Sequence, residues 1–326
     1  MLMMAGLLGV MMMGAAFVGD LAGEEEEIEA EDDASELTAE DEILTDIGDD
    51  ANAIVGTEGS DTITGTEEAE ELLGLDGSDQ INGYEGDDTV LAGGGNDYAH
   101  GGTGEDAIHG HDGNDNLHGD DGDDRVYGDG GDDSIYGDLG DDDLWGGNGA
   151  DALVGGSGND AVYGETGSDA LQGMSGNDML VGGEEQDTVF GGYGNDTLIG
   201  TVLDDLGNDN DGTDFLNGGA GDDEVYAGAS DIIHLGRGED TVLIGTWVGE
   251  TEALVQDFNV SEDKLVVVYD DAVAEDPVIQ LVEDSDLPGI TYLVVDGASL
   301  LAIEDAGDLR AADISLMGQS AISVQL

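Results

Sequence analysis

The chain has no cysteine, two prolines, few aromatic side chains and only four Lys and Arg residues in 326. The absence of cysteine excludes disulfides and thiolate metal sites. The shortage of basic residues leaves no positive patch for nucleic acid or for an anionic membrane surface, so we expect neither as a partner. Crosslinks and cationic surfaces therefore explain neither how this chain folds nor what it binds.

Acidic residues are abundant instead. The chain contains 80 Asp and Glu residues and has a formal net charge of -76. Repulsion on this scale opposes a compact state, so the chain must stay unfolded, live in high salt or bind many cations. A solvated acidic tail usually has blocks of like charge. The strict spacing described next does not fit that interpretation.

A carboxylate recurs every nine residues without a slip, which predicts that no insertion interrupts the array. The positions are Asp61, Glu70, Asp79, Asp88, Asp97, Asp106, Asp115, Asp124, Asp133, Asp142, Asp151, Asp160, Asp169, Asp178, Asp187, Asp196, Asp205, Asp214 and Asp223. A period this short indicates one small structural unit stacked many times. The last two units, around Asp231 and Asp240, are shifted by one residue.

Each unit combines glycines, one Asp and one aliphatic residue. Units 155–163 (GGSGNDAVY) and 191–199 (GGYGNDTLI) fit the pattern G-G-x-G-x-D-x-U-x, which is typical of calcium-binding parallel β-helices. We expect positions 1 to 6 to form a turn, since Gly permits unusual backbone angles, and positions 7 to 9 to form a short strand. Calcium takes six to eight hard oxygen ligands, which carbonyls and Asp from two turns would supply.

The middle residue of each short strand, at position 8, is predicted to point inward. It is aliphatic in Ile63, Ile81, Val90, Ile108, Leu117, Val126, Ile135, Leu144, Leu153, Val162, Leu171, Leu180, Val189 and Leu198. One such side chain stabilises a unit by less than the entropy cost of ordering nine residues. We therefore expect calcium binding to be coupled to folding.

The array resembles the RTX (hemolysin-type calcium-binding) repeats of secreted proteins from Gram-negative bacteria. The resemblance implies a right-handed parallel β-roll with two nonapeptides per coil, so that calcium lies between each turn and the second turn after it. It pairs Asp79 with Asp97, Asp97 with Asp115, Asp88 with Asp106, and so on to Asp160 with Asp178. The segment 255–268 also resembles the sequence that follows such repeats, and family members typically leave the cell by a type I system.

The predicted calcium ligands are the ladder carboxylates of the regular units. They are Asp79, Asp88, Asp97, Asp106, Asp115, Asp124, Asp133, Asp142, Asp151, Asp160, Asp169, Asp178, Asp196, Asp214 and Asp223. Units 65–73, 182–190 and 200–208 depart from the pattern, so we expect weakened or missing calcium there. In the second, Glu185 replaces a Gly; in the third, Leu203 replaces a Gly and Gly207 stands at the inward position.

The predicted fold class is all-β, a parallel β-roll closed by an antiparallel β cap. Residues 1–19 are an apolar signal peptide or retained anchor, and residues 20–55 an acidic disordered linker. Residues 56–243 form the calcium-binding roll, and residues 244–326 the β-rich cap, which is also a candidate secretion signal. Within the cap, Asp296-Gly297 indicates a hairpin turn.

Position 9 should point outward, so every second unit should contribute to the same column on one sheet. One column contains Leu73, Leu91, His109, Tyr127, Trp145, Tyr163, Val181 and Ile199; the other contains Asn82, His100, His118, Tyr136, Val154, Gln172 and Phe190. Tyr127, Trp145 and Tyr163 suggest a polysaccharide platform or a self-association face. We favour the simpler interpretation that these aromatic side chains cover their strands. The four histidines from His100 to His118 could form a transition-metal site, but we favour the interpretation that they are surface residues.

Motifs for a metalloprotease helix, a nucleophile elbow and a phosphate-binding loop are all missing from the sequence. The leading hypothesis is a non-enzymatic, exported β-roll that binds many Ca²⁺ ions and has a structural or adhesive role outside the cell, secreted or anchored at the surface by residues 1–19. The alternatives are a carbohydrate-binding module and a polysaccharide-modifying enzyme. The expected partners are calcium ions, extracellular polysaccharide or a second copy of the chain, and the export machinery.

Overall fold

The computed structural model describes residues 52–202, 212–245, 251–269 and 277–319. The predictions for residues 1–19, for the acidic linker up to residue 51 and for most of unit 200–208 lie outside these ranges. In the described part of the chain, no helix is long and apolar enough to cross a membrane.

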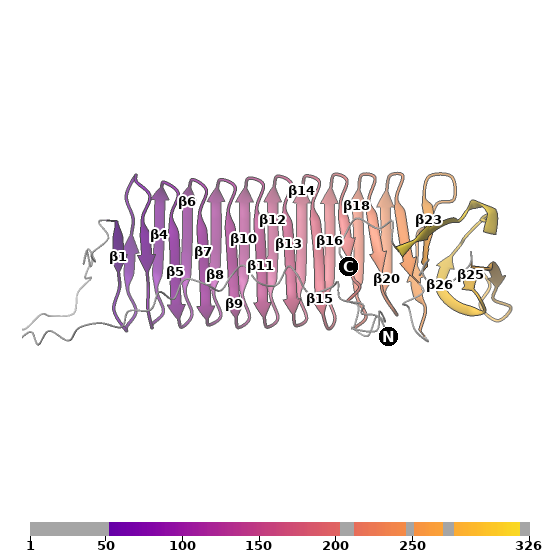
Figure 1. Ribbon diagram of the computed structural model, residues 1–326, viewed down its shortest axis with the longest axis horizontal. Helices are drawn as coiled ribbons and strands as arrows, with labels where there is room; N and C mark the ends of the chain where they lie inside the picture. Colours follow the sequence, from indigo (N-terminus) through magenta and orange to yellow (C-terminus); the bar gives the residue numbers. More distant parts are fainter. Residues whose placement is uncertain (1–51, 203–211, 246–250, 270–276, 320–326) are drawn as a thin grey trace, which may run out of the picture. The chain divides into compact units, whose positions relative to one another are not determined.

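Two sheets make up the described part of the roll, and strands alternate between them along the chain (Figure 1). The first contains β1 (Ala53–Val55), β3 (Glu71–Leu73), β5 (Thr89–Gly94), β7 (Ala107–Asp112), β9 (Arg125–Gly130), β11 (Asp143–Asn148), β13 (Ala161–Thr166), β15 (Met179–Glu184), β17 (Thr197–Ile199), β19 (Glu224–Ala227), β21 (Thr241–Gly245), β23 (Lys264–Tyr269) and β27 (Ser315–Gly318). The second contains β2 (Thr62–Thr64), β4 (Gln80–Glu85), β6 (Tyr98–Thr103), β8 (Asn116–Asp121), β10 (Ser134–Leu139), β12 (Ala152–Ser157), β14 (Ala170–Ser175), β16 (Thr188–Tyr193), β18 (Phe215–Ala220), β20 (Ile232–Arg237), β22 (Ala253–Val255), β26 (Ala298–Glu304), β25 (Ile290–Val295) and β24 (Ile279–Glu283). Strand pairing starts at Ala53, before the Gly56 at which the sequence places the array.

Successive coils pair in parallel, and each residue lies opposite its equivalent in the second repeat along the chain. In the second sheet, Ile135 lies opposite Leu117 on one side and Leu153 on the other. The same relation holds between Leu144 and its neighbours in the first sheet. This register confirms the parallel roll of two nonapeptides per coil, and it also aligns the two predicted outer columns.

The core is a column of aliphatic side chains from each sheet. The position 8 residues Leu144, Leu153 and Val162 are all 0% exposed. Alternate residues of each strand face outward, because side chains in a strand point to opposite faces in turn. The predicted inward residues are therefore confirmed as the core.

The strands are longer than predicted. Each regular strand has six residues and continues through positions 1 to 3 of the next unit, as β12 does from Ala152 to Ser157. The turn before β13 is only three residues long, 158–160. The expected six-residue turn is therefore wrong, because backbone pairing between coils resumes at positions 2 and 3, just beyond the position 1 glycine.

One insertion interrupts the array, contrary to the sequence prediction. The pairing step lengthens by one whole repeat in both sheets at this point. Thr188 of β16 lies opposite Phe215 of β18, and Thr197 of β17 lies opposite Glu224 of β19. Gly200 keeps the position 1 contact, donating its N–H to Tyr226 O at 3.1 Å. A Cβ on Gly212 would lie 2.1 Å from Glu185 O. In the regular units, a Cβ on the position 4 glycine would lie similarly close to the position 4 carbonyl one coil earlier, so Gly212 is at position 4. Nine extra residues, 203–211, therefore separate positions 3 and 4 of one turn.

After the insertion, the pairing step becomes one residue shorter than in the regular array, as predicted for the units around Asp231 and Asp240. Phe215 lies opposite Ile232, and Glu224 lies opposite Thr241. The two sheets then continue into the C-terminal segment.

The C-terminal segment is antiparallel only in part. Strands β22, β23, β26 and β27 extend the two sheets in parallel, whereas β24, β25 and β26 pair antiparallel. The hairpin turn at Asp296-Gly297 is confirmed, with φ of 51° and 92°. A short 3-10 helix (Ala311–Asp313) precedes β27. The predicted cap is therefore mixed, since its apolar strands first complete the core of the roll.

Candidate metal centre

The ladder carboxylates stand at position 6, directly before each strand. Because successive turns alternate between the two edges of the roll, the carboxylates form two rows, each made of every second unit. In one row the Asp79 N–H donates to Asp97 Oδ1 at 2.8 Å, and the Asp97 N–H donates to Asp115 Oδ1 at 2.8 Å. In the other row the Asp88 N–H donates to Asp106 Oδ1 at 2.7 Å. The pairs expected from the sequence are thus adjacent.

Both rows extend over the insertion without losing this contact. The Asp187 N–H donates to Asp214 Oδ1, and the Asp196 N–H donates to Asp223 Oδ1, each at 2.9 Å and across 27 residues. Asp205 is passed over by both contacts. We call the two rows, from Asp79 to Asp223 without Asp205, the Asp ladder.

In the ladder residues named next, the second carboxylate oxygen, Oδ2, is buried and has no hydrogen-bond partner within the described part of the chain. This holds for Asp79, Asp88, Asp97, Asp106, Asp115, Asp124, Asp133, Asp142, Asp151, Asp160, Asp169, Asp178, Asp187, Asp196 and Asp223. A buried charge without a partner is strongly unfavourable. A cation at each of these oxygens would remove that cost.

Glycine at position 1 makes room for Oδ2. A Cβ on Gly137 would lie 2.3 Å from Asp142 Oδ2, and one on Gly155 would lie 2.4 Å from Asp160 Oδ2. Real Cβ atoms do not approach an oxygen so closely, so a side chain at position 1 of these turns would force a shift of Oδ2 or of the backbone. Ala92, at position 1 of the unit that contains Asp97, shows that one turn of the ladder accommodates a Cβ there.

Backbone carbonyls approach the same turns. The point where Gly113 would carry a Cβ lies 1.5 Å from Gly95 O and 3.0 Å from Asp115 Oδ1. Gly131 and Gly167 have the same relation, at 1.6 Å, to the carbonyls of Gly113 and Gly149 one coil earlier. Each turn thus brings together carboxylate and carbonyl oxygens, the hard donors that Ca²⁺ prefers.

Burial raises the pKa of the ladder carboxyl groups. Neighbouring carboxylates raise it further, whereas the backbone N–H that Oδ1 accepts lowers it; for Asp142, the neighbours are Asp124, Asp123 and Asp138. The pKa is raised to about 7 in Asp124, Asp133, Asp142, Asp160, Asp169, Asp178 and Asp223, and to about 6 in Asp79, Asp106, Asp115, Asp187 and Asp240. Without a metal ion, burial therefore disfavours the ionised form of these carboxyl groups.

The first units differ from the rest of the ladder. Asp61 accepts the Thr57 N–H of its own turn at 2.6 Å, and Glu70 accepts the Thr66 N–H of its own turn at 3.0 Å. Both carboxylates therefore accept from their own turn, whereas a regular ladder carboxylate such as Asp79 accepts the N–H of Asp61 one coil earlier. The weak site expected in unit 65–73 stays a prediction.

Several carboxylates outside the predicted set accept backbone N–H groups of the preceding coil. Asp187 was left out because of Glu185, yet it is 2% exposed and its Oδ2 has no hydrogen-bond partner within the described residues. Asp240 and Asp263 extend one row, with the Asp240 N–H donating to Asp263 Oδ1 at 3.2 Å. Asp257 accepts the N–H groups of Leu235 and Gly236. The sequence does contain a signal for Asp263. The spacing of position 6 Asp and position 8 aliphatic residue recurs in Asp263 and Leu265, where the glycines of the repeat are no longer present.

Comparison with known proteins places the repeats in a described family. The family model described as RTX calcium-binding nonapeptide repeat (4 copies) matches residues 46–67, 64–99, 100–135, 136–171, 172–209 and 208–242. No curated protein matches the chain.

Solved structures that are similar to the chain at low identity include the following three. The AlgE6R3 subunit of the Azotobacter vinelandii mannuronan C5-epimerase is 21% identical over 43% of this chain and 82% of its own, with a TM-score of 0.30. A Ca²⁺-dependent β-helical antifreeze protein from an Antarctic bacterium is 21% identical over 66% of this chain and 74% of its own, with a TM-score of 0.39. The extracellular lipase LipA from Serratia marcescens is 15% identical over 82% of this chain, which spans 40% of the lipase, with a TM-score of 0.24.

Proposed function

The chain belongs to the RTX calcium-binding nonapeptide repeat family, whose repeats bind multiple Ca²⁺ ions, and from this premise we propose that it is an exported, non-enzymatic β-roll whose folding requires calcium. Its role would be structural or adhesive, at or outside the cell surface. The observation that carries the proposal is the row of buried Oδ2 atoms without hydrogen-bond partners, repeated along the described parts of both edges.

The proposed ligands are the Asp ladder and the position 4 carbonyls beside it. This set contains the residues expected from the sequence and adds Asp187, whose surroundings match those of its neighbours. Asp61 and Glu70 are left out, since their own turns already satisfy them. When bound, calcium would neutralise the buried carboxylates and link consecutive coils.

Calcium-coupled folding supports an extracellular site of action. A formal net charge of -76 opposes compaction, and the ladder places its carboxylates one coil apart. Calcium sites of extracellular modules typically have dissociation constants of about 10⁻⁴ to 10⁻³ M. A chain with such sites would stay unfolded during export and fold where calcium is plentiful.

The aromatic column gives little support to the carbohydrate-binding alternative. Tyr127 and Trp145 stack with centroids 4.5 Å apart and planes at 5°, and Trp145 and Tyr163 stack at 5.6 Å and 9°. The rings cover one another's faces, whereas a sugar needs an open face on which to stack. The aromatic side chains therefore pack against one another on the outer face of the first sheet. No observation favours a polysaccharide-modifying enzyme.

Calcium uptake by the full chain tests the proposal. Equilibrium dialysis at neutral pH should give many ions per chain, and size-exclusion chromatography should show a smaller hydrodynamic radius in calcium than in chelator. An equal amount of magnesium is the control, because Mg²⁺ demands stricter octahedral geometry and keeps its waters. Equal radii in calcium and chelator would contradict calcium-dependent folding.

A further inference from the structure

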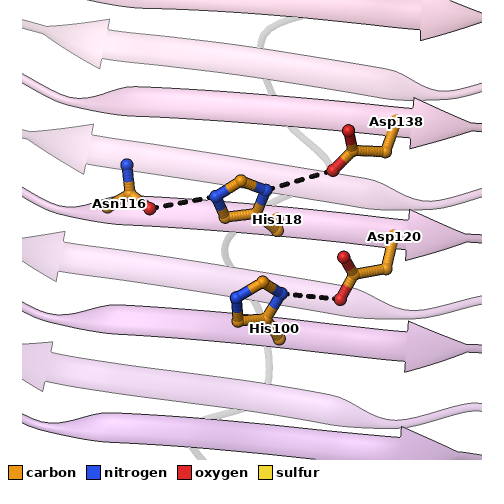
Figure 2. A network of polar contacts seen from close by, with 5 residues as sticks. All are labelled: His100, Asn116, His118, Asp120 and Asp138. Carbon is orange, nitrogen blue, oxygen red and sulfur yellow. Dashed lines mark hydrogen bonds and ion pairs between the residues drawn. The ribbon is translucent and has the colours of Figure 1, made fainter.

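A cluster of histidine and aspartate side chains lies on the outer surface of the second sheet, away from the Asp ladder. His100 on β6 lies opposite His118 on β8, and Gly102 lies opposite Asp120 in the same register. The two imidazoles stack with centroids 4.6 Å apart and planes at 13°. Figure 2 shows the rings one above the other, with an aspartate beside each.

Each ring nitrogen Nδ1 in this cluster contacts a carboxylate of the following coil. His100 Nδ1 lies 2.7 Å from Asp120 Oδ2, and His118 Nδ1 lies 3.1 Å from Asp138 Oδ2 (Figure 2). His118 Nε2 also lies 3.0 Å from Asn116 Oδ1. Both rings are therefore oriented before any ligand arrives.

His100, His118 and Asp120 together have the arrangement of a metal site. One ligand atom from each lies within 4.8 Å of the other two, and within the described ranges this is the only trio of His, Cys, Asp or Glu side chains that meets this distance. The side chains of His100 and His118 are 22% and 20% exposed. They are thus partly shielded, yet open to an ion from solvent.

The donor set differs in kind from that of the ladder. Imidazole nitrogens suit Zn²⁺, Cu²⁺ and Ni²⁺, whereas Ca²⁺ prefers oxygen alone. We propose that His100 Nδ1, His118 Nδ1 and the Asp120 carboxylate bind a divalent transition-metal ion of the Zn²⁺ class. The ion would replace the present contact of His118 Nδ1 with Asp138, and Asn116 would hold the ring through Nε2. The roll then carries a second metal class on a sheet face, separate from the calcium at its edges.

A second pair of histidines provides a matched comparison. His109 and His111 on β7 both place Nδ1 3.5 Å from Asp129 Oδ2. Their rings stack with centroids 5.7 Å apart, but both come from one strand instead of from two neighbouring strands. They belong to the first sheet and have the same side-chain types. His234 on β20 is a further control, because its ring contacts Phe215 on the same sheet as the proposed site.

The test is a titration of the full chain with Zn²⁺, and separately with Co²⁺, in saturating calcium, which keeps the ladder occupied. We expect one equivalent to bind more tightly than any other, and Co²⁺ bound there to give visible absorption. His100→Ala and His118→Ala should each weaken this binding at least tenfold. Asn116→Ala removes the group that holds His118 through Nε2 and should weaken binding about 10- to 100-fold, the usual loss when a group that orients a ligand is removed.

The controls decide between this site and general binding to acidic surface. His109→Ala and His234→Ala should keep the affinity of the wild type, and far-UV circular dichroism in calcium should confirm that every variant is folded. Zn²⁺ affinity unchanged in the folded His100→Ala/His118→Ala double variant would overturn the proposal. So would displacement of the Co²⁺ signal by a modest further addition of calcium. Neither result would bear on calcium-dependent folding, which circular dichroism reports independently.

Discussion

Replacing Asp142 with Asn isolates the charge of one ladder carboxylate. Asp142 is 1% exposed, and its Oδ1 accepts the Asp124 N–H at 2.9 Å. An Asn side chain has nearly the same shape and can accept this N–H through its amide oxygen. It places an uncharged NH₂ group where Oδ2 lies beside Gly137. The substitution therefore changes the charge at the turn with little change in packing.

The effect of Asp142→Asn should depend on calcium. An ion present at a hundred times its dissociation constant stabilises the folded state by about 2.7 kcal/mol, so loss of one site should cost about that much in high calcium. When calcium is scarce, the variant should lose nothing or gain stability. The reason is that burial and neighbouring carboxylates raise the pKa of Asp142 to about 7, so its ionised form opposes folding.

Thermal unfolding over a series of calcium concentrations measures this effect. The gap between wild type and Asp142→Asn should widen as calcium rises, and the fluorescence of Trp145, three residues further on in β11, should report the loss locally in a Trp247→Phe background. Asp205→Asn is the matched control, since it has the same nine-residue spacing but both rows pass it over. A constant gap at all calcium concentrations, or an equal loss in Asp205→Asn, would refute the reasoning.

Three further changes test other parts of the structure. In chelator, acidification from pH 8 to pH 5 should increase the strand content measured by circular dichroism. Carboxyl groups whose pKa is raised to about 6 or 7 stabilise the fold at low pH, and they lose that contribution as the pH rises through those values. Unchanged strand content would contradict this. Gly155→Ala should destabilise the calcium-bound fold by about 1–3 kcal/mol in thermal unfolding, since its Cβ would lie 2.4 Å from Asp160 Oδ2. Gly59→Ala, whose Cβ would have no neighbour closer than 3.8 Å, should lower the stability much less. Equal losses of stability would argue against the close contact at Gly155. Deletion of residues 203–211 joins Val202 to Gly212 and restores a regular G-T-V-G-T-D turn. The strand signal in circular dichroism should be kept, and the melting temperature should stay the same or rise. Loss of the strand signal would show that the fold needs this segment.

Much of the fold could be predicted from the nine-residue spacing. It placed Leu144 and Leu153 in the core, because every unit repeats the same backbone path. The pairing of each ladder carboxylate with that of the second unit, and the alignment of the outer columns, came from the resemblance to the RTX repeats, since the spacing alone does not say how many units make one coil. The strand length was missed, since glycines usually mark turns, whereas here pairing between coils carries them into the strand.

The insertion could not be found from spacing alone. Residues 203–211 have the same length as one repeat, so Asp205 and Asp214 both remain in register. The pairing of Thr188 with Phe215 and of Thr197 with Glu224 shows that one repeat is passed over, and the contacts of Gly200 and Gly212 show where. Asp187 was rejected for a related reason: Glu185 departs from the pattern at position 4, but it adopts a φ of 85° there and leaves the carboxylate in place.

The central claim is that calcium binding and folding of the roll are one process. Far-UV circular dichroism of the purified full chain, followed during a calcium titration from chelator at neutral pH, tests it most directly. We predict an unordered spectrum in chelator and a cooperative gain of β signal as calcium rises, reversed by renewed chelation. A full strand signal already present in chelator would contradict the claim.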